Sequence, residues 1–389
     1  MIYLDNQAST RCDPRVVAAM LPWFTELYAN PASIEHQAGR QAADAVEVAR
    51  AEVAALLGAQ PSEIIFTSGA TEANNLAIKG AARFAGPAAR RRIITAATEH
   101  KCVLESVRDL GAEGFEPIVL AVAPDGGLAR DVLDGALATP TLLVSLMAAN
   151  NETGFLADIP ALAGAAHAAG AKFHSDLAQA AGKIPVDLAG WGVDLASISA
   201  HKLYGPKGIG ALFVRRRPRM RLAPLFSGGG QERGLRAGTL PAALIIGFGE
   251  ACRLARLELT AEHVRVAALR DRMLAVLRAR IPGLALIGGL ENRLASNLTL
   301  RFPGVDARAL IEACPGLALS TGSACTSAEL TPSHVLTALG LSAAQAAATL
   351  RVGIGRFTSP ADIDAAAAML VSAYTALAHA SLTPLHAEA

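Results

Sequence analysis

The sequence predicts an α/β protein with a mostly parallel sheet covered by helices, followed by a smaller α+β domain. Up to about residue 255, short and nearly continuous apolar runs alternate with helical patterns, which is typical of parallel strands buried on both faces. Beyond that point the pattern changes to a long helix, a few short strands and a final helix. Because 389 residues suffice for two or three domains, we expect a large domain over residues 13–255 and a small one over residues 1–12 and 256–389.

The first helices are indicated by their caps and by apolar spacing. Asp13 followed by Pro14 pairs a capping residue with a proline at the first helical position, and predicts a helix to about Leu27. A longer helix is expected over about residues 35–57, where Gly58 ends it.

The strands of the large sheet are indicated by apolar runs separated mostly by helical patterns. These runs cover residues 64–67, 93–96, 117–121, 142–147, 171–174, 195–199 and 210–214. In the second domain we expect short strands at residues 297–302, 318–320 and 350–354, and a final helix over residues 362–380.

Charge, cysteine content and hydropathy exclude several classes of protein. Lys and Arg number 35 against 34 Asp and Glu, and this net charge of +1 argues against a nucleic-acid binder. The five cysteines are odd in number and contain no C-x-x-C pair, so we expect neither a disulfide framework nor a metal site. The longest charge-free stretches, residues 330–350 and 365–387, are Ala-rich and interrupted by polar residues, and the first residues do not resemble a signal peptide. We therefore expect a cytoplasmic protein that does not enter a membrane.

Two of the predicted strands end in residues that suit an anion and a catalyst. Ligands of open α/β sheets bind at the carboxyl ends of strands. The strand at residues 64–67 runs into a turn, Ser68-Gly69-Ala70-Thr71, that opens a helix, and free N–H groups there predict an anion site, with a plain helix cap as the alternative. His100 follows the strand at residues 93–96, where by itself it says little.

Two further strand ends carry an acid and a lysine. Asp176 follows the strand at residues 171–174, with Gln179 three residues on, although a helix cap would also explain this acid. Lys202 follows the strand at residues 195–199, where an unpaired ammonium is costly and a Schiff base would account for it. Residues 205–208 do not have P-loop spacing, so nucleotide binding is not expected. Together the four strand ends fit pyridoxal 5'-phosphate (PLP), which needs a phosphate cradle, a carboxylate at its ring nitrogen and a Schiff-base lysine.

The chain resembles the cysteine desulfurases, PLP-dependent enzymes with the aminotransferase class V fold, which is similar to that of aspartate aminotransferase. The resemblance extends from about residue 3 to residue 380, and the final motif is similar to that of the group with a long cysteine loop. The motifs that carry it lie at residues 3–6, 67–72, 98–100, 150–154, 200–208, 236–239 and 320–327.

This resemblance implies an activity: conversion of L-cysteine to L-alanine, with transfer of the sulfur to Cys325 as a persulfide and then to an acceptor protein. The acceptor would serve iron–sulfur cluster assembly or the thiolation of tRNA or cofactors. The resemblance also implies a homodimer, in which Thr239 reaches the cofactor phosphate of the second subunit.

The resemblance further implies a role for each matching residue. Lys202 would hold the cofactor, and His100, stacked on its ring, and Cys325 would complete the catalytic set. Asp176 would pair with the ring nitrogen and Gln179 with the phenolic oxygen. The implied cofactor contacts are Ala70, Thr71, His100, Asn151, Asp176, Gln179, Ser199, His201, Lys202 and Thr239, and the implied substrate contacts are Asn30, Asn151 and Arg351.

Some positions depart from the family pattern, and other functions stay open. Leu177-Ala178 replaces the usual Ala followed by Thr or Val, and Gln7 and Ser9 alter the N-terminal motif. The alternatives are a selenocysteine lyase or another class V enzyme, and a non-catalytic binding module of a sulfur pathway. The module is disfavoured because Lys202 and Cys325 are intact together with Asp176 and His100.

Overall fold

The computed structural model of the chain describes residues 1–86, 90–321 and 332–382. The chain starts with β1 (Ile2–Tyr3) and three helices, α1 (Pro14–Met20), α2 (Pro22–Thr25) and α3 (Gln37–Leu56). The side chain of Asp13 accepts a hydrogen bond from Arg15 N and caps α1, as expected. The single helix expected to Leu27 is instead two short ones, because Pro22 cannot continue the hydrogen bonding of α1 and begins α2.

The described residues include a seven-stranded sheet with the order β2-β8-β7-β6-β5-β3-β4. β7, β6, β5, β3 and β4 are mutually parallel, whereas β8 runs antiparallel to both β2 and β7. The prediction of a mostly parallel sheet is therefore confirmed. Its strands are β2 (Ile64–Thr67), β3 (Arg92–Ala96), β4 (Glu116–Leu120), β5 (Thr141–Ser145), β6 (Lys172–Asp176), β7 (Leu195–Ser199) and β8 (Gly210–Val214).

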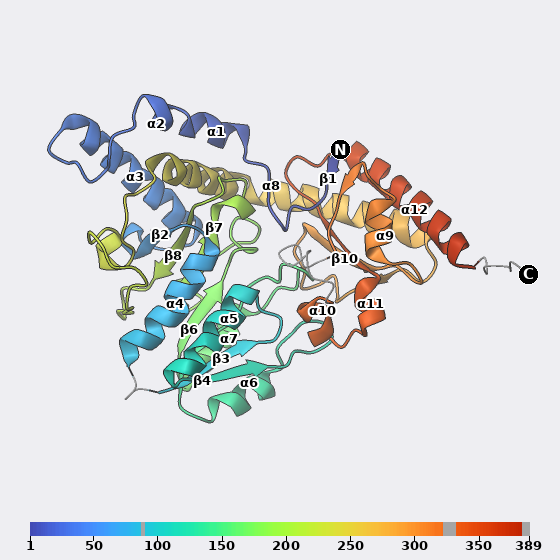
Figure 1. Cartoon of the computed structure of the whole chain (residues 1–389), viewed down its shortest axis with the longest axis horizontal. Helices are drawn as coiled ribbons and strands as arrows, with labels where there is room; N and C mark the ends of the chain where they lie inside the picture. The colour runs from blue at the N-terminus through green and yellow to red at the C-terminus, as the bar shows by residue number, and fades with distance from the viewer. Residues whose placement is uncertain (87–89, 322–331, 383–389) are drawn as a thin grey trace, which may run out of the picture.

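Helices cover both faces of this sheet (Figure 1). Successive residues of a strand point to opposite faces, so Ile93 packs in a cluster with residues of α4 (Ala70–Ala85) and α5 (Lys101–Asp109). Its neighbour Ile94 packs in a second cluster, on the other face, with residues of α3, α6 (Arg130–Leu137) and α7 (Ile159–Ala168). Burial on both faces is the reason why these strands read as continuous apolar runs.

The C-terminal part has its own hydrophobic cluster around a smaller antiparallel sheet. The order of this sheet is β12-β10-β9, from β12 (Thr349–Gly353), β10 (Asn297–Arg301) and β9 (Ala285–Leu286), and β1 pairs with β11 (Leu317–Ala318). The helices of this part are α9 (Ala307–Glu312), α10 (His334–Ala338), α11 (Ala343–Ala347) and α12 (Pro360–Leu382).

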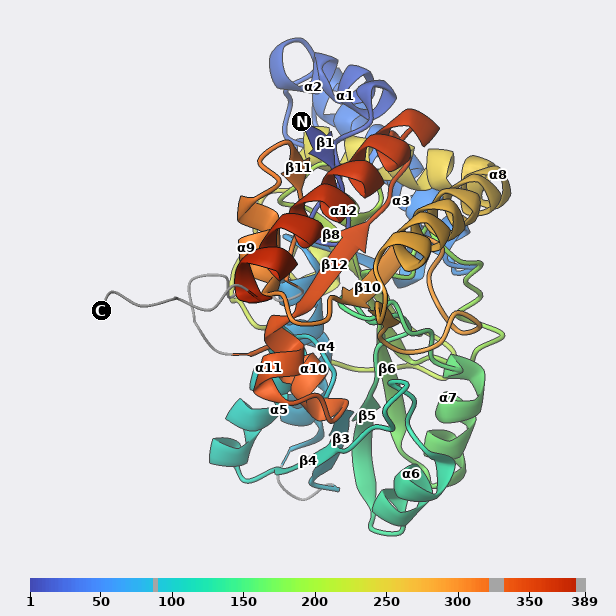
Figure 2. The same ribbon diagram turned by 90° about the vertical axis from the view of Figure 1, so that its right-hand side faces the viewer.

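The long helix α8 (Ala242–Arg280) connects the two parts (Figures 1 and 2). Ile245, Phe248 and Cys252 in its first half pack in the cluster beneath the large sheet. Met273 and Leu277 in its second half pack in the C-terminal cluster. The exact division into domains stays a prediction.

One described helix, α12, is apolar enough over Pro360–His379 to cross a membrane by length and composition alone. Ile363, Ala366 and Leu370 on this helix are nevertheless fully buried in the C-terminal cluster. One face of α12 therefore packs on the C-terminal cluster.

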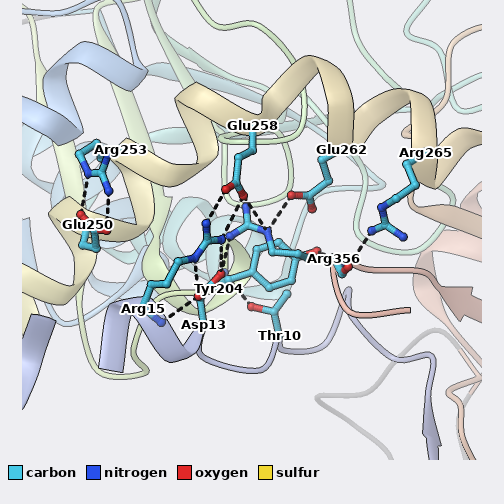
Figure 3. A network of polar contacts seen from close by, with 10 residues as sticks. All are labelled: Thr10, Asp13, Arg15, Tyr204, Glu250, Arg253, Glu258, Glu262, Arg265 and Arg356. Atoms are coloured by element: carbon cyan, nitrogen blue, oxygen red, sulfur yellow. Dashed lines mark hydrogen bonds and ion pairs between the residues drawn. The ribbon is translucent and has the colours of Figure 1, made fainter. Parts of the chain in front are cut away.

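A network of polar contacts ties the turn after Lys202 to the C-terminal part (Figure 3). The hydroxyl of Tyr204 accepts a hydrogen bond from Arg356 N at 2.7 Å, and the Arg356 guanidinium lies 4.3 Å from the centre of the Tyr204 ring. Arg356 also pairs with Asp13 at 2.9 Å and with Glu262 of α8 at 2.8 Å. Tyr204 has a φ of 64°, a conformation that non-glycine residues rarely adopt and that these contacts help to hold.

Candidate active site

A pocket of about 490 Å³ lies at the carboxyl end of the large sheet. Its walls come from the ends of β6 and β7, the starts of α4 and α5, the N-terminal residues 7–9 and β12 of the C-terminal part. The expected site residues that line it are Ala70, Thr71, His100, Asn151, Asp176, Gln179, Ser199, His201, Lys202 and Arg351.

Three expected site residues are not among those lining this pocket. Asn30 is exposed, and its Oδ1 accepts a hydrogen bond from Ala32 N at 2.9 Å within its own turn. Thr239 is exposed as well. Cys325 lies outside the described residues. The roles of all three stay predictions.

The start of α4 forms one wall of the pocket as a small-residue turn. Its N-cap is Gly69, so no side chain caps the helix, and the first N–H groups are open toward the pocket side where Ala70 and Thr71 lie. A Cβ atom on Gly210 would lie 2.7 Å from the Cα of Gly69, so glycine is needed there for β8 to pass this close. This geometry suits an anion such as a phosphate.

The carboxylate of Glu72, which would repel an anion at this turn, is held by two hydrogen bonds. It accepts one from Ser68 N at 2.7 Å and one from Arg236 Nε at 2.9 Å. Burial alone would raise the pKa of Glu72, but Arg236 and Ser68 outweigh it and lower this pKa. The negative charge is therefore neutralised by Arg236.

Lys202 ends the short 3-10 helix Ala200–Lys202 that follows β7. Its Nζ donates hydrogen bonds to the backbone oxygens of Gln7 and Ala8, the latter at 2.8 Å. The N-terminal segment is brought there by backbone contact, because Thr10 N donates to His201 O at 2.9 Å. Backbone carbonyls thus hold the amine in place at the pocket wall.

His201 points to the same N-terminal segment and is neutral at pH 7. Its Nδ1 lies 3.2 Å from Ser9 Oγ. Burial, reinforced by the nearby charges of Lys202, Lys207 and Lys183, lowers the pKa of His201 to about 4. A neutral imidazole can donate one hydrogen bond to an anion without adding a positive charge.

Asp176 is the last residue of β6 and is nearly fully buried. Its Oδ2 accepts a hydrogen bond from Asn74 Nδ2 at 2.7 Å, and its Oδ1 accepts one from Ala178 N at 2.8 Å. A turn follows this residue, not a helix, so the alternative of a helix cap is wrong. The carboxylate is fixed by an amide from α4 and lines the pocket.

His100 caps α5 at the pocket wall, with a buried acid behind it. The Nδ1 atom of His100 accepts a hydrogen bond from Cys102 N at 3.2 Å and lies 3.0 Å from Cys102 Sγ. Glu99 accepts from Met147 N at 2.6 Å, and full burial raises the pKa of Glu99 well above its usual value. Burial thus favours the uncharged form of Glu99 beside His100.

Arg351 and Asn151 form the wall that faces the sheet. Arg351, buried on β12, donates from Nη1 to Asn151 O at 2.9 Å and pairs through Nη2 with Asp5 at 2.8 Å. Within the part of the chain that the structure describes, the buried Oδ1 atom of Asn151 has no hydrogen-bond partner. A ligand that donates a hydrogen bond would satisfy this atom.

Several residues of the site were missed from sequence. Gln7 and Ala8 hold the Lys202 amine, Asn74 holds Asp176, and Cys102 and His334 line the pocket. A signal existed only for Asn74, which lies one helical turn after Ala70 and so falls on the same side of α4. The others are brought in by tertiary contacts that no local pattern reports.

These residues fit PLP. The open helix start, with Ser199 and His201 beside it, suits a phosphate, Asp176 suits a protonated ring nitrogen, and the Lys202 amine suits the aldehyde. A polar ligand in this pocket would also give the Oδ1 atom of Asn151 a partner.

Comparison with known proteins agrees with the geometry. A family model, aminotransferase class-V, matches residues 2–366. The chain belongs to this family. It is 51% identical over 364 residues to the mitochondrial cysteine desulfurase of Arthroderma benhamiae, covering 93% of this chain and 72% of the relative. It is 49% identical over 371 residues to the cysteine desulfurase IscS of Rickettsia akari, covering 95% of this chain and 90% of the relative.

The fold of this class-V chain is also found in solved structures. The structure of a NifS-like protein superposes with a TM-score of 0.88 at 33% sequence identity, covering 97% of this chain and 99% of that one. The prediction of a PLP-dependent aminotransferase-type fold is therefore confirmed.

Proposed function

We propose that this chain is a cysteine desulfurase, which uses PLP to convert L-cysteine to L-alanine and transfers the sulfur to a cysteine of the enzyme. The observation that carries the proposal is the pocket itself. The Lys202 amine, the Asp176 carboxylate and the open start of α4 line one cavity at the carboxyl end of the sheet. The similarity to named cysteine desulfurases over nearly the whole chain supports the choice of reaction.

The residues of the pocket have distinct tasks toward the cofactor. Thr71, Ser199 and His201 would hold the phosphate, and Asp176 would keep a proton on the ring nitrogen through its negative charge. Bound PLP draws electrons from the carbon atoms next to the substrate amine, so that the Cα proton can leave and the C–S bond can break.

Other residues act on the substrate. Lys202 Nζ would hold the cofactor through its aldehyde and, once displaced by the substrate amine, would take the proton from Cα. Arg351 binds the substrate carboxylate, for which its buried guanidinium supplies charge and hydrogen bonds. The thiolate of Cys325 forms an S–S bond with the substrate sulfur as the C–S bond breaks, and the product carbon takes up a proton.

Labelling of Lys202 tests the proposal directly. Purified protein loaded with PLP should absorb visible light, and reduction with borohydride should leave the cofactor on Lys202 in mass spectra. Lys207 lines the same pocket and is the internal control, because it should carry no label. With L-cysteine, the enzyme should release equal amounts of alanine and transferable sulfur. A label on Lys207, or protein that stays colourless with added PLP, would contradict the proposal.

The enzyme is proposed to be a homodimer whose sites are completed across the interface. Thr239 is exposed, yet Arg236, three residues earlier, pairs with Glu72 at the pocket wall. This segment therefore runs beside the turn at the start of α4, while Thr239 is not among the residues that line its own pocket.

Subunit mixing tests the dimer. Lys202→Ala and Thr239→Ala chains should each be inactive or weak, and their mixture should regain up to about a quarter of wild-type activity, since a shared interface produces one intact site in half of the dimers. The control is a preparation that contains only Lys202→Ala chains and is taken through the same mixing procedure. A fully active monomer in light scattering would contradict the dimer.

The sulfur acceptor and the location belong to the proposal as well. We infer delivery to an acceptor protein of iron–sulfur cluster assembly or of tRNA or cofactor thiolation, in the cytoplasm. The described cysteines Cys12, Cys102, Cys252 and Cys314 are free thiols, which suits a reducing compartment. Capture of proteins that take ³⁵S from the sulfur-loaded enzyme would identify the acceptor, and labelling of a secreted or membrane protein alone would contradict this assignment.

A further inference from the structure

A half-buried lysine, Lys183, lies behind the pocket wall and has no part in the reaction described above. Lys183 is on the turn that follows Gln179, where Lys183 N donates to Ala180 O at 3.0 Å and folds the chain back. Its Nζ thereby reaches the side chain of Gln179 and donates to Oε1 at 2.8 Å. Gln179 is only 4% exposed, so its amide depends on protein partners.

The surroundings of Gln179 determine which end of its amide faces which way. On one side is the Lys183 ammonium, which can only donate, and on the other is the backbone oxygen of Gln7, which can only accept. With Oε1 toward Lys183, Nε2 donates to Gln7 O at 2.9 Å. The reversed amide would place two donors together and two acceptors together in a buried site, which costs about 1–3 kcal/mol for each unsatisfied group.

The same Gln7 oxygen also accepts from Lys202 Nζ. One carbonyl thus brings the nitrogen of Gln179 and the amine of Lys202 to the same place on the pocket wall. The N–H edge of Gln179, not its oxygen, is therefore next to the Lys202 amine.

We propose that Lys183 is a positioning residue that fixes the Gln179 amide so that its N–H groups face the pocket beside Lys202. The inference rests on the proposed function, because the ligand atom that would accept from Gln179 is an oxygen of the cofactor bound at Lys202. Without a donor at position 183, only the Gln7 oxygen opposes rotation of the amide, and a rotated amide would offer its oxygen, which repels an oxygen of the ligand.

Loss of the proton from Lys183 does not remove its hydrogen bond to Gln179. Burial, followed by the charge of Lys202, lowers the pKa of Lys183 to about 7, with Arg351 acting in the same direction and Glu262 opposing it. Both the ammonium and the neutral amine carry N–H groups that can donate to Gln179 Oε1. The neutral amine can also accept, but a reversed amide would still place Oε1 against the Gln7 oxygen.

A double-mutant cycle tests this chain of contacts. Lys183→Met removes the donor while keeping the apolar stem, and Gln179→Leu removes the amide. The readouts are the visible absorption band of the bound cofactor, the apparent pKa of that band and the dissociation constant of PLP from spectral titration. Lys183→Met should shift the band and weaken PLP binding about fivefold, the effect of about one hydrogen bond. In the Gln179→Leu background, Lys183→Met should change neither the absorption band nor the dissociation constant of PLP any further.

Two controls separate positioning from stability. Lys79→Met removes a lysine that pairs with Asp109 away from the pocket, and should leave the band unchanged. Lys183→Arg keeps a side chain that only donates, and should restore the wild-type band even where its larger size lowers the melting temperature. An unchanged band in Lys183→Met, or equal effects with and without Gln179, would overturn the inference. A wild-type chain that binds no PLP would instead contradict the proposed function.

Discussion

At the scale of single residues, the pocket combines groups from the sheet with groups that only tertiary structure brings in. Asp176 and Lys202 follow apolar strands, so their place at the carboxyl edge of the sheet could be predicted from sequence. Gln7 lies 195 residues from Lys202 along the chain, and its contact with the amine is made through its backbone oxygen. Side-chain chemistry gives no signal for such a contact, which is why the holder of the amine was missed.

The proposed nucleophile gives a prediction at this scale. Cys325→Ser should bind PLP and L-cysteine as the wild type does, because Lys202, Asp176 and the start of α4 are untouched. It should lose essentially all sulfide release, since a hydroxyl cannot accept the sulfur as a thiolate does. Absorption spectra and a sulfide assay with added reductant check both parts.

The remaining cysteines supply the matched controls for that variant. Cys252 and Cys314 are buried among apolar side chains, and burial raises the pKa of both thiols. Cys252→Ala and Cys314→Ala should therefore keep their sulfide release per folded molecule. Normal release by Cys325→Ser would favour direct elimination of the sulfur or selenocysteine lyase chemistry.

At the scale of elements, sequence patterns located the strands well because most are buried on both faces. β7 and β8 have the bounds expected for them, 195–199 and 210–214. The first predicted helix is longer than the observed one. The apolar pattern around Leu21 does not show that α1 ends there and that Pro22 starts a second helix. β11 (Leu317–Ala318) overlaps the strand expected at residues 318–320, whereas the two-residue β9 was not expected, because so short an element depends on its partner across the sheet.

A row of hydrogen bonds across three central strands gives a prediction for acid stability. His174 of β6 lies between Ser145 Oγ of β5 at 2.8 Å and Ser197 Oγ of β7 at 3.0 Å. Burial lowers the pKa of His174 to about 3, against 6.5 for an unperturbed histidine. Between these values the unfolded chain binds the extra proton and the folded chain does not, so the free energy of unfolding should fall as pH drops from 6.5 to 3.

The size of this effect can be measured against a variant. One proton of difference corresponds to a slope of about 1.4 kcal/mol per pH unit at most. His174→Gln keeps a donor and an acceptor but does not titrate, so urea unfolding at pH 4.5, 5.5 and 6.5 should show a shallower slope. Equal slopes for wild type and His174→Gln would contradict the assignment.

At the scale of the whole molecule, the pocket needs both parts of the chain. β12 of the C-terminal part supplies Arg351, and the large sheet supplies Asp176 and Lys202. The network around Arg356 and Tyr204 joins these parts close to Lys202 (Figure 3). The resemblance to a family predicted the overall architecture, but this network involves residues between positions 13 and 356 and could not be found from spacing.

Arg356 gives the corresponding prediction. Arg356→Met leaves the buried carboxylate of Asp13 and that of Glu262 without this partner, and should lower the free energy of unfolding by about 3 kcal/mol. The control is Arg272→Met, which breaks a solvent-exposed pair with Asp364 and should lower the free energy of unfolding far less, because exposed pairs contribute little to stability. If both variants lose the same free energy of unfolding in urea, the network around Arg356 contributes no more to stability than an exposed ion pair.

The long helix α8 has a consequence for how the protein unfolds. One continuous helix supplies side chains to both hydrophobic clusters. If either cluster unfolds, α8 loses part of its apolar contacts, and the other cluster, which packs on the same helix, is destabilised as well. We expect a single cooperative transition, seen at the same denaturant concentration by Trp23 and Trp191 fluorescence and by circular dichroism. Partly unfolded molecules that keep the cofactor-binding half and lose Arg351 should be rare, so a population of these enzymes contains complete pockets or none.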